Sequence, residues 1–313
     1  MRWVWIAGFL MASCASEDLP VEGADTSSPP TAPSLADPPT TPPVTTATTE
    51  PVVAPDFSTV GGVAFVTQDA SIVSGGCTLS YTRFQPDQAV SDVNIVLSHG
   101  FMRNRRHVAG WAEHLASWGL MVYTPNLCHT TAFDSDHVQN GIDLVALATS
   151  VARGGGTIYI GHSAGGLASL LAASTDPAAV AVLGLDPVDS GGLGVAAAAD
   201  LAIPARALLA EGSSCNSQNN GYDMTVAASD HQALLIPGAD HCSFESPTDA
   251  GCTLFCGGQG GLLTEYEIAE TVAAMSVAYG MWQSGAQTEA GQWWTPGAIW
   301  YDLLLDDGRI VAR

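Results

Sequence analysis

The stretch TIYIGHSAGG, residues 157–166, decides the fold. Its first four residues read as a short buried strand, and the following LASLLAAST continues as a helix. A Gly-x-Ser-x-Gly motif between a strand and a helix places its serine on a tight turn, with the hydroxyl projecting above the sheet. Gly161 and Gly165 leave room for backbone that a Cβ atom would block. The stretch therefore predicts a strand, a sharp turn carrying Ser163, and a helix.

Short apolar strands and helical stretches alternate on both sides of this turn. The alternation predicts an α/β fold, with a mostly parallel, doubly wound sheet that is flanked by helices and opens with an antiparallel pair. In such sheets the functional residues follow the carboxyl ends of the strands. We expect strands at 61–66, 77–84, 93–100, 120–126, 157–163, 179–187, 205–212 and 231–241, and helices at 105–119, 136–153, 164–175 and 262–282.

Two histidines flank the last predicted strand, and the strand direction separates them. His231 enters the strand, whereas His241 follows its carboxyl end in the loop GADHCSFESP. Ser163 lies at that same edge of the sheet, so His241 is the candidate base for a nucleophilic serine. We expect the other histidines to be structural or exposed, with His99 and His162 shaping the loops in which they lie.

A carboxylate is needed to hold the base in the correct tautomer. Asp186 directly follows the strand 179–185, and Pro187 fixes the backbone after it. The next strand runs into the loop SSCNSQNN, which has no aspartate, so that only Glu211 is available there. Asp186 is the candidate acid, and Asp189 and Glu211 remain alternatives.

Developing negative charge on the substrate would need two backbone donors. One is the N–H of Ala164, because that residue follows the serine and begins a helix whose dipole favours negative charge. The other is expected from the loop HGFMRNRR, through the N–H of Phe101 or, as an alternative, that of Met102. Phe101 and Ala164 are thus the candidate oxyanion donors.

The charge of the chain excludes some partners. Its formal net charge is −22, with 31 acidic residues, 9 arginines and no lysine. Such a chain is repelled by phosphate backbones and by anionic lipid surfaces. We therefore expect no nucleic-acid partner, and membrane attachment only through a covalent anchor.

The first 56 residues are predicted to lie outside the folded body. One arginine and a ten-residue apolar stretch, too short to span a bilayer, are typical of a secretory signal. The sequence MASC resembles the lipobox of bacterial lipoproteins, which implies a signal peptide at 1–14 and lipidation of Cys14. Ordinary secretion and a retained apolar stub are the alternatives. Residues 15–56, rich in Pro and Thr, are predicted to form an extended, disordered stalk.

The six cysteines other than Cys14 form an even set, which in an exported chain suggests disulfides. Fifteen complete pairings are possible, and the sequence does not choose among them. A metal site at CTLFC, residues 252–256, is the competing interpretation, but no companion set of ligands accompanies it. We expect neither a metal nor a cofactor. The six residues are Cys77, Cys128, Cys215, Cys242, Cys252 and Cys256.

Residues 60–283 resemble the α/β-hydrolase superfamily, and within it the chlorophyllase-like and cutinase-type polyester-hydrolase-like esterases. The stretch LSHGFMRNRRHVAGWAEHLASWGLMVYTPN resembles their oxyanion loop and first helix, and GHSAGG resembles their nucleophile turn. GLDPVD resembles the chlorophyllase stretch that carries the acid. The sequence departs from both groups after the nucleophile, where chlorophyllases carry arginine, polyester hydrolases favour methionine, and this chain has Ala164.

The resemblance implies a serine hydrolase that cleaves small-molecule or polymeric carboxylic esters without a cofactor, with Ser163, Asp186 and His241 as its triad. Two alternatives stay open: an amidase or peptidase on the same fold, and a non-catalytic surface binding protein. The catalytic domain is expected at 57–283. The Trp-rich extension 284–313 is expected to pack on this domain, and the protein is expected to be a monomer.

Overall fold

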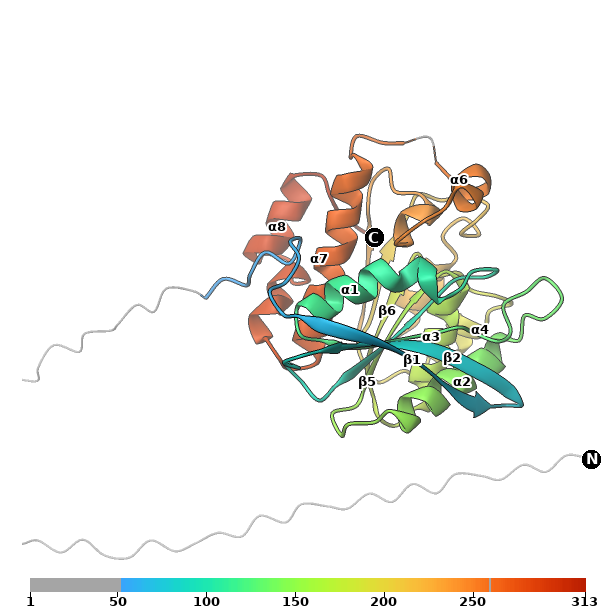
Figure 1. The fold of residues 1–313 in the computed structure, drawn as a ribbon. Coiled ribbons are helices and arrows are strands. Elements are labelled where there is room, and N and C mark those ends of the chain that lie inside the picture. Colours follow the sequence, from blue (N-terminus) through green and yellow to red (C-terminus); the bar gives the residue numbers. More distant parts are fainter. Residues whose placement is uncertain (1–51, 259) are drawn as a thin grey trace, which may run out of the picture. The chain divides into compact units, whose positions relative to one another are not determined.

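The computed structural model describes residues 52–258 and 260–313. The predicted signal peptide, Cys14 and the stalk up to residue 51 lie outside the described residues. Within the described part, the chain forms a mixed α/β body around one sheet (Figure 1).

Nine strands form the sheet in the order β1-β2-β4-β3-β5-β6-β7-β8-β9 within the described residues. The six strands from β4 to β8 in this order are parallel, whereas β1 and β2 pair antiparallel at one edge and β9 pairs antiparallel at the other. The predicted mostly parallel α/β sheet is confirmed. The strands are β1 Phe65–Ser74, β2 Cys77–Pro86, β3 Asn94–Ser98, β4 Met121–Pro125, β5 Thr157–His162, β6 Ala179–Leu185, β7 Ala205–Leu209, β8 His231–Leu235 and β9 Val311–Ala312.

Helices cover both faces of the sheet because successive strand residues point to opposite sides. Ile158 and Ile160 of β5 pack with α1, α7 and the C-terminal segment, whereas Tyr159 packs with α2 and α3 on the other face. Figure 1 shows α1, α7 and α8 on one side of the sheet and α2 and α3 on the other. The helices are α1 Ala109–Ser117, α2 His137–Ser150, α3 Ala164–Thr175, α4 Leu193–Ala198, α5 Gly221–Val226, α6 Ala250–Cys256, α7 Glu265–Gln283 and α8 Ile299–Asp306, with 3₁₀ turns η1 Arg105–Val108, η2 His241–Phe244 and η3 Thr288–Trp293.

The two edges of the sheet differ from the sequence prediction. The first strand, expected at 61–66, lies at Phe65–Ser74, and its residues are mostly exposed as they pair with β2. An exposed edge strand carries polar residues on both faces, so the apolar pattern that locates a buried strand is missing. The short strand β9 was not predicted, because two exposed residues carry no pattern at all.

The Trp-rich C-terminal segment packs on the body and holds the first described residues. The indoles of Trp293 and Trp300 stack with their ring centroids 4.5 Å apart. Their N–H groups donate to the carbonyl oxygens of Pro55 and Ala54, at 3.3 and 2.8 Å. Residues 52–56, which the sequence places at the end of the stalk, therefore lie against this segment.

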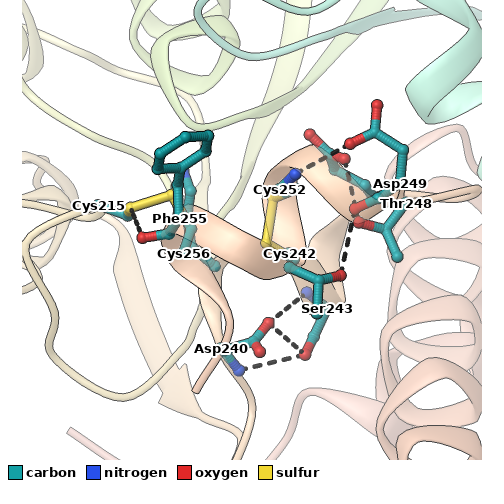
Figure 2. The surroundings of a disulfide bond; sticks show 12 residues. Cys215, Asp240, Cys242, Ser243, Thr248, Asp249, Cys252, Phe255 and Cys256 are labelled. Atoms are coloured by element: carbon teal, nitrogen blue, oxygen red, sulfur yellow. Dashed lines mark hydrogen bonds between the residues drawn. A yellow bond between two sulfur atoms is a disulfide. The ribbon is translucent and has the colours of Figure 1, made fainter.

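Three disulfides join the six cysteines, so the predicted disulfide bonds are confirmed. The pairs are Cys77–Cys128, Cys215–Cys256 and Cys242–Cys252. The last two meet on α6, which carries both Cys252 and Cys256 (Figure 2). Disulfides persist in oxidising compartments, so they indicate an exported protein.

The described residues contain neither a membrane-spanning helix nor a cluster of metal ligands. In residues 52–258 and 260–313, no helix has both the length and the apolar character needed to cross a bilayer. The same ranges contain no group of three or more His, Cys, Asp or Glu side chains suited to hold a metal ion.

Candidate active site

Ser163 lies on the strained turn between β5 and α3. Its backbone has φ 55° and ψ −126°, a conformation that residues other than glycine rarely adopt. The Ser163 N–H donates to the Leu185 carbonyl at 3.1 Å, and the Val188 N–H donates to the Ser163 carbonyl at 3.1 Å. A Cβ on Gly165 would collide with the backbone oxygens of His99 and Ser98, so α3 can approach the end of β3 and the loop after it only with glycine there.

Ser163, His241 and Asp186 form one continuous chain of hydrogen bonds. His241 Nε2 lies 2.9 Å from Ser163 Oγ, and His241 Nδ1 lies 2.5 Å from Asp186 Oδ2. The serine and the histidine are each 6 % exposed, and the aspartate is fully buried. This is the arrangement in which a histidine can take a proton from the serine while a carboxylate fixes its tautomer.

The loop after β8 fixes the position of His241. Asp240 caps η2 by accepting the Ser243 N–H at 2.9 Å, and the Ser243 hydroxyl lies 3.1 Å from the Asp240 N–H. On the other side, His162 Nε2 donates to the His241 carbonyl at 3.0 Å, and the two rings pack with centroids 4.6 Å apart. Burial, followed by the proximity of His241, lowers the pKa of His162 well below its usual value. His162 therefore stays neutral and serves as a donor.

Of the three candidate acids, the structure brings only Asp186 to His241. The Asp186 Oδ1 also accepts the Ala210 N–H at 2.9 Å. Asp189 instead accepts the N–H of Gly194 at 2.8 Å at the start of α4. Glu211 is exposed and accepts the Gly238 N–H at 3.3 Å.

Phe101 and Ala164, the two candidate oxyanion donors, differ from Met102 in whether the backbone N–H group is already hydrogen-bonded. The Met102 N–H donates to the Thr130 carbonyl at 2.7 Å, which removes the alternative donor. Among the described residues, the N–H groups of Phe101 and Ala164 have no acceptor. Ala164 begins α3, where the first N–H groups of a helix lack partners within the helix. These two N–H groups are thus available to a negatively charged oxygen.

His99 shapes the loop that carries Phe101. Its Nδ1 donates to the Gly100 carbonyl at 2.9 Å, and its Nε2 accepts the Leu127 N–H at 3.0 Å. Burial lowers the pKa of His99 to about 4. The neutral ring therefore joins the loop after β3 to the segment after β4 at any pH near neutrality.

A partly buried ion pair joins the loop after β3 to the loop of His241. Arg103 donates to both carboxylate oxygens of Glu245, at 2.6 and 2.5 Å, and lies 3.1 Å from Asp249. Burial opposes the charge of Arg103, but its hydrogen bonds to Glu245 and Asp249 outweigh burial and raise its pKa. Trp111 adds a second link by donating to the Phe244 carbonyl at 2.8 Å.

The sequence did not single out Asn216, Arg103 or Glu245. Asn216 is fully buried, and its amide nitrogen lies 3.3 and 3.2 Å from the two Asp186 oxygens. It lies in SSCNSQNN, a loop whose composition gives no period from which to place a side chain. Arg103 and Glu245 are far apart in the sequence, and only the tertiary fold pairs them. The neighbouring Cys215 was the one local signal that this loop is held in place.

Comparison with protein-family models and with curated proteins gives no match to this chain. What the protein does is therefore inferred from the geometry around Ser163.

Proposed function

We propose that the protein is a serine hydrolase with an α/β-hydrolase fold that cleaves carboxylic esters. The observation that carries this proposal is the buried chain from Ser163 Oγ through His241 to Asp186, next to two backbone N–H groups without an acceptor in the described residues. A strand-to-helix turn with a strained serine, on a mostly parallel sheet, supports the fold assignment.

In the proposed mechanism, Ser163 Oγ attacks the ester carbonyl as His241 Nε2 takes its proton. The carbonyl oxygen becomes negatively charged and accepts hydrogen bonds from the N–H groups of Phe101 and Ala164. The tetrahedral intermediate collapses to an acyl-enzyme as His241 protonates the leaving alcohol. Water, deprotonated by His241, then attacks the acyl group, and the carboxylic acid leaves as Ser163 regains its proton. Asp186 orients the imidazole and stabilises its positive charge throughout.

The proposal is tested with p-nitrophenyl esters from acetate to palmitate, with p-nitroanilides as the amide comparison. The wild-type chain should hydrolyse the esters. Asp186→Asn should lower kcat by about 10⁴-fold, because the amide favours the wrong tautomer of His241. Glu211→Gln is the matched control and should retain wild-type activity, since Glu211 contacts Gly238 and lies outside the hydrogen-bonded chain.

Two results would contradict the proposal. A folded chain that cleaves anilides faster than esters would be an amidase, and one that cleaves neither would favour a binding protein. Equal losses in Asp186→Asn and Glu211→Gln would remove the role assigned to Asp186.

The proposal includes export and a lipid anchor at Cys14. The disulfides favour an oxidising compartment, and MASC resembles a lipobox. In a bacterial host, Cys14→Ser should move the protein from the membrane fraction to the soluble one. A membrane fraction that is unchanged in Cys14→Ser would contradict anchoring at this residue. We propose that the chain acts as a monomer on a small-molecule or polymeric ester.

A further inference from the structure

Asn216 is the third donor to the buried carboxylate of Asp186. Besides Asn216, that carboxylate accepts the Ala210 N–H and the His241 Nδ1–H. Both Asn216 and Asp186 are fully buried. A buried carboxylate is costly unless donors surround it, so three donors stabilise the negative charge that His241 requires.

The loop itself fixes the orientation of the Asn216 amide. Its oxygen accepts the Ser213 N–H at 2.8 Å and the Asn219 N–H at 3.3 Å. A backbone N–H can only donate, so the oxygen must face these groups and the NH₂ group must face Asp186. The same NH₂ group lies 2.9 Å from the Glu211 carbonyl, which restricts it further.

A disulfide holds the loop of Asn216 next to the loop of His241. Cys215, the residue before Asn216, is bonded to Cys256 of α6. Cys242, the residue after His241, is bonded to Cys252 of the same helix. Figure 2 shows both disulfides meeting on this helix. Residues adjacent to the base and to the donor of the acid are thus attached to one short element.

We propose that Asn216 is a positioning residue that holds the Asp186 carboxylate in line with His241, and that the disulfides on α6 keep it there. This inference rests on the proposed function. It predicts that catalysis depends on the NH₂ group of Asn216 and not merely on an ordered loop.

Asn216→Asp separates these two roles. An aspartate keeps an oxygen for the Ser213 and Asn219 N–H groups, but it replaces the NH₂ donor with a second carboxylate beside Asp186. We expect kcat/KM to fall by about 10²-fold, the loss typical of a displaced catalytic group. The acid limb of the pH–rate profile should move to higher pH by about one unit, because a second negative charge stabilises the protonated imidazole.

Gln218→Glu is the matched control. It adds the same charge to the same loop, on an exposed side chain outside the hydrogen bonds that join Asn216 to Asp186. We expect its kcat/KM and its pH profile to match the wild type. Asn216→Ser is the second variant, since a hydroxyl can still accept the Ser213 N–H in a turn. Its shorter side chain withdraws the donor from Asp186 without adding charge, so kcat should fall while KM and the acid limb stay unchanged.

The inference is overturned if a folded Asn216→Ser chain keeps wild-type kcat, or if Gln218→Glu loses as much as Asn216→Asp. A wild-type chain that hydrolyses no ester would contradict the proposed function instead. In that case NMR titration of the His241 ring protons decides the inference. A midpoint at higher pH in Asn216→Asp, and not in Gln218→Glu, supports the role of Asn216, and equal midpoints overturn it.

Discussion

Ser163 and its two hydrogen-bonded partners are held in place by different means. Ser163 lies between β5 and α3, fixed by backbone hydrogen bonds and by glycines whose Cβ positions are occupied by neighbouring backbone. His241 and the donors to Asp186 lie on loops after β7 and β8. Two disulfides, the Arg103–Glu245 ion pair and side-chain hydrogen bonds hold those loops.

The two regions of the site therefore depend on different interactions. The serine turn is strained, and strain of about 1–3 kcal/mol persists only where the surrounding structure over-determines it. The sheet provides that rigidity. The loop after β7 is strained as well, since Ser217, Gln218 and Asn219 all have positive φ. There the Cys215–Cys256 disulfide and the side-chain hydrogen bonds of Asn216 take the place of the sheet.

The largest expected effect concerns the disulfides on α6. Cys215→Ser/Cys256→Ser opens a loop of 41 residues and should lower the free energy of unfolding by about 4 kcal/mol. Hydrogen exchange should rise in residues 211–220 and 238–258 while residues 157–175 keep their protection, because the turn of Ser163 is held by the sheet. Mass-spectrometric hydrogen exchange on the folded variant measures both.

The control is Cys77→Ser/Cys128→Ser, which opens a loop of 51 residues and should also cost about 4 kcal/mol. It should leave exchange in residues 238–258 unchanged. If exchange in residues 157–175 rose as much as in 211–220 after loss of Cys215–Cys256, the two regions would not be held separately.

The next effect concerns the turn itself. Gly165→Ala should lower the free energy of unfolding by about 3 kcal/mol, the cost of forcing an extra methyl group against the backbone of His99. Gly62→Ala adds the same methyl where no heavy atom lies within 4 Å and should leave stability unchanged. Urea unfolding of both variants measures the difference, and equal midpoints would show that the turn tolerates the added methyl.

The smallest effect is a pH dependence from His99, which joins the loop after β3 to the segment after β4. Its pKa falls from 6.5 to about 4 in the folded protein because it is buried. Between these two pH values the imidazole is protonated in the unfolded chain but not in the folded chain. Stability is therefore lost as pH falls below 6.5. His99 alone should account for a loss of about 2 kcal/mol between pH 7 and pH 5, and the buried His162 adds to the total in the same direction.

Urea unfolding across this pH range tests the dependence. His99→Gln should reduce the slope of stability against pH, leaving the part due to His162, whereas His231→Gln, a change at an exposed histidine, should not change it. A slope that His99→Gln leaves unaltered would assign the pH dependence to other groups.

The sequence predicted the parts of the site that follow from local pattern and strand direction. An apolar strand, a Gly-x-Ser-x-Gly turn and the carboxyl-end rule were enough to choose Ser163, His241 and Asp186, which the structure brings into contact. The core strands were predicted for the same reason, since a buried parallel strand is a continuous apolar run.

What the sequence did not predict depends on contacts between distant segments. The Cys215–Cys256 pairing, the approach of Asn216 to Asp186 and the Arg103–Glu245 pair arise only when loops from different strands meet. The edge strands β1 and β9 were misplaced or missed because exposed strands carry no apolar period.

The central claim is that Ser163 is an activated nucleophile, and covalent labelling tests it most directly. The full chain is incubated with a fluorophosphonate, and the labelled peptide is identified by mass spectrometry. We predict one label per chain, on Ser163, and none in Ser163→Ala, whose thermal unfolding should match the wild type. A folded wild-type chain that takes no label, or a Ser163→Ala chain that is labelled as readily, would contradict the account.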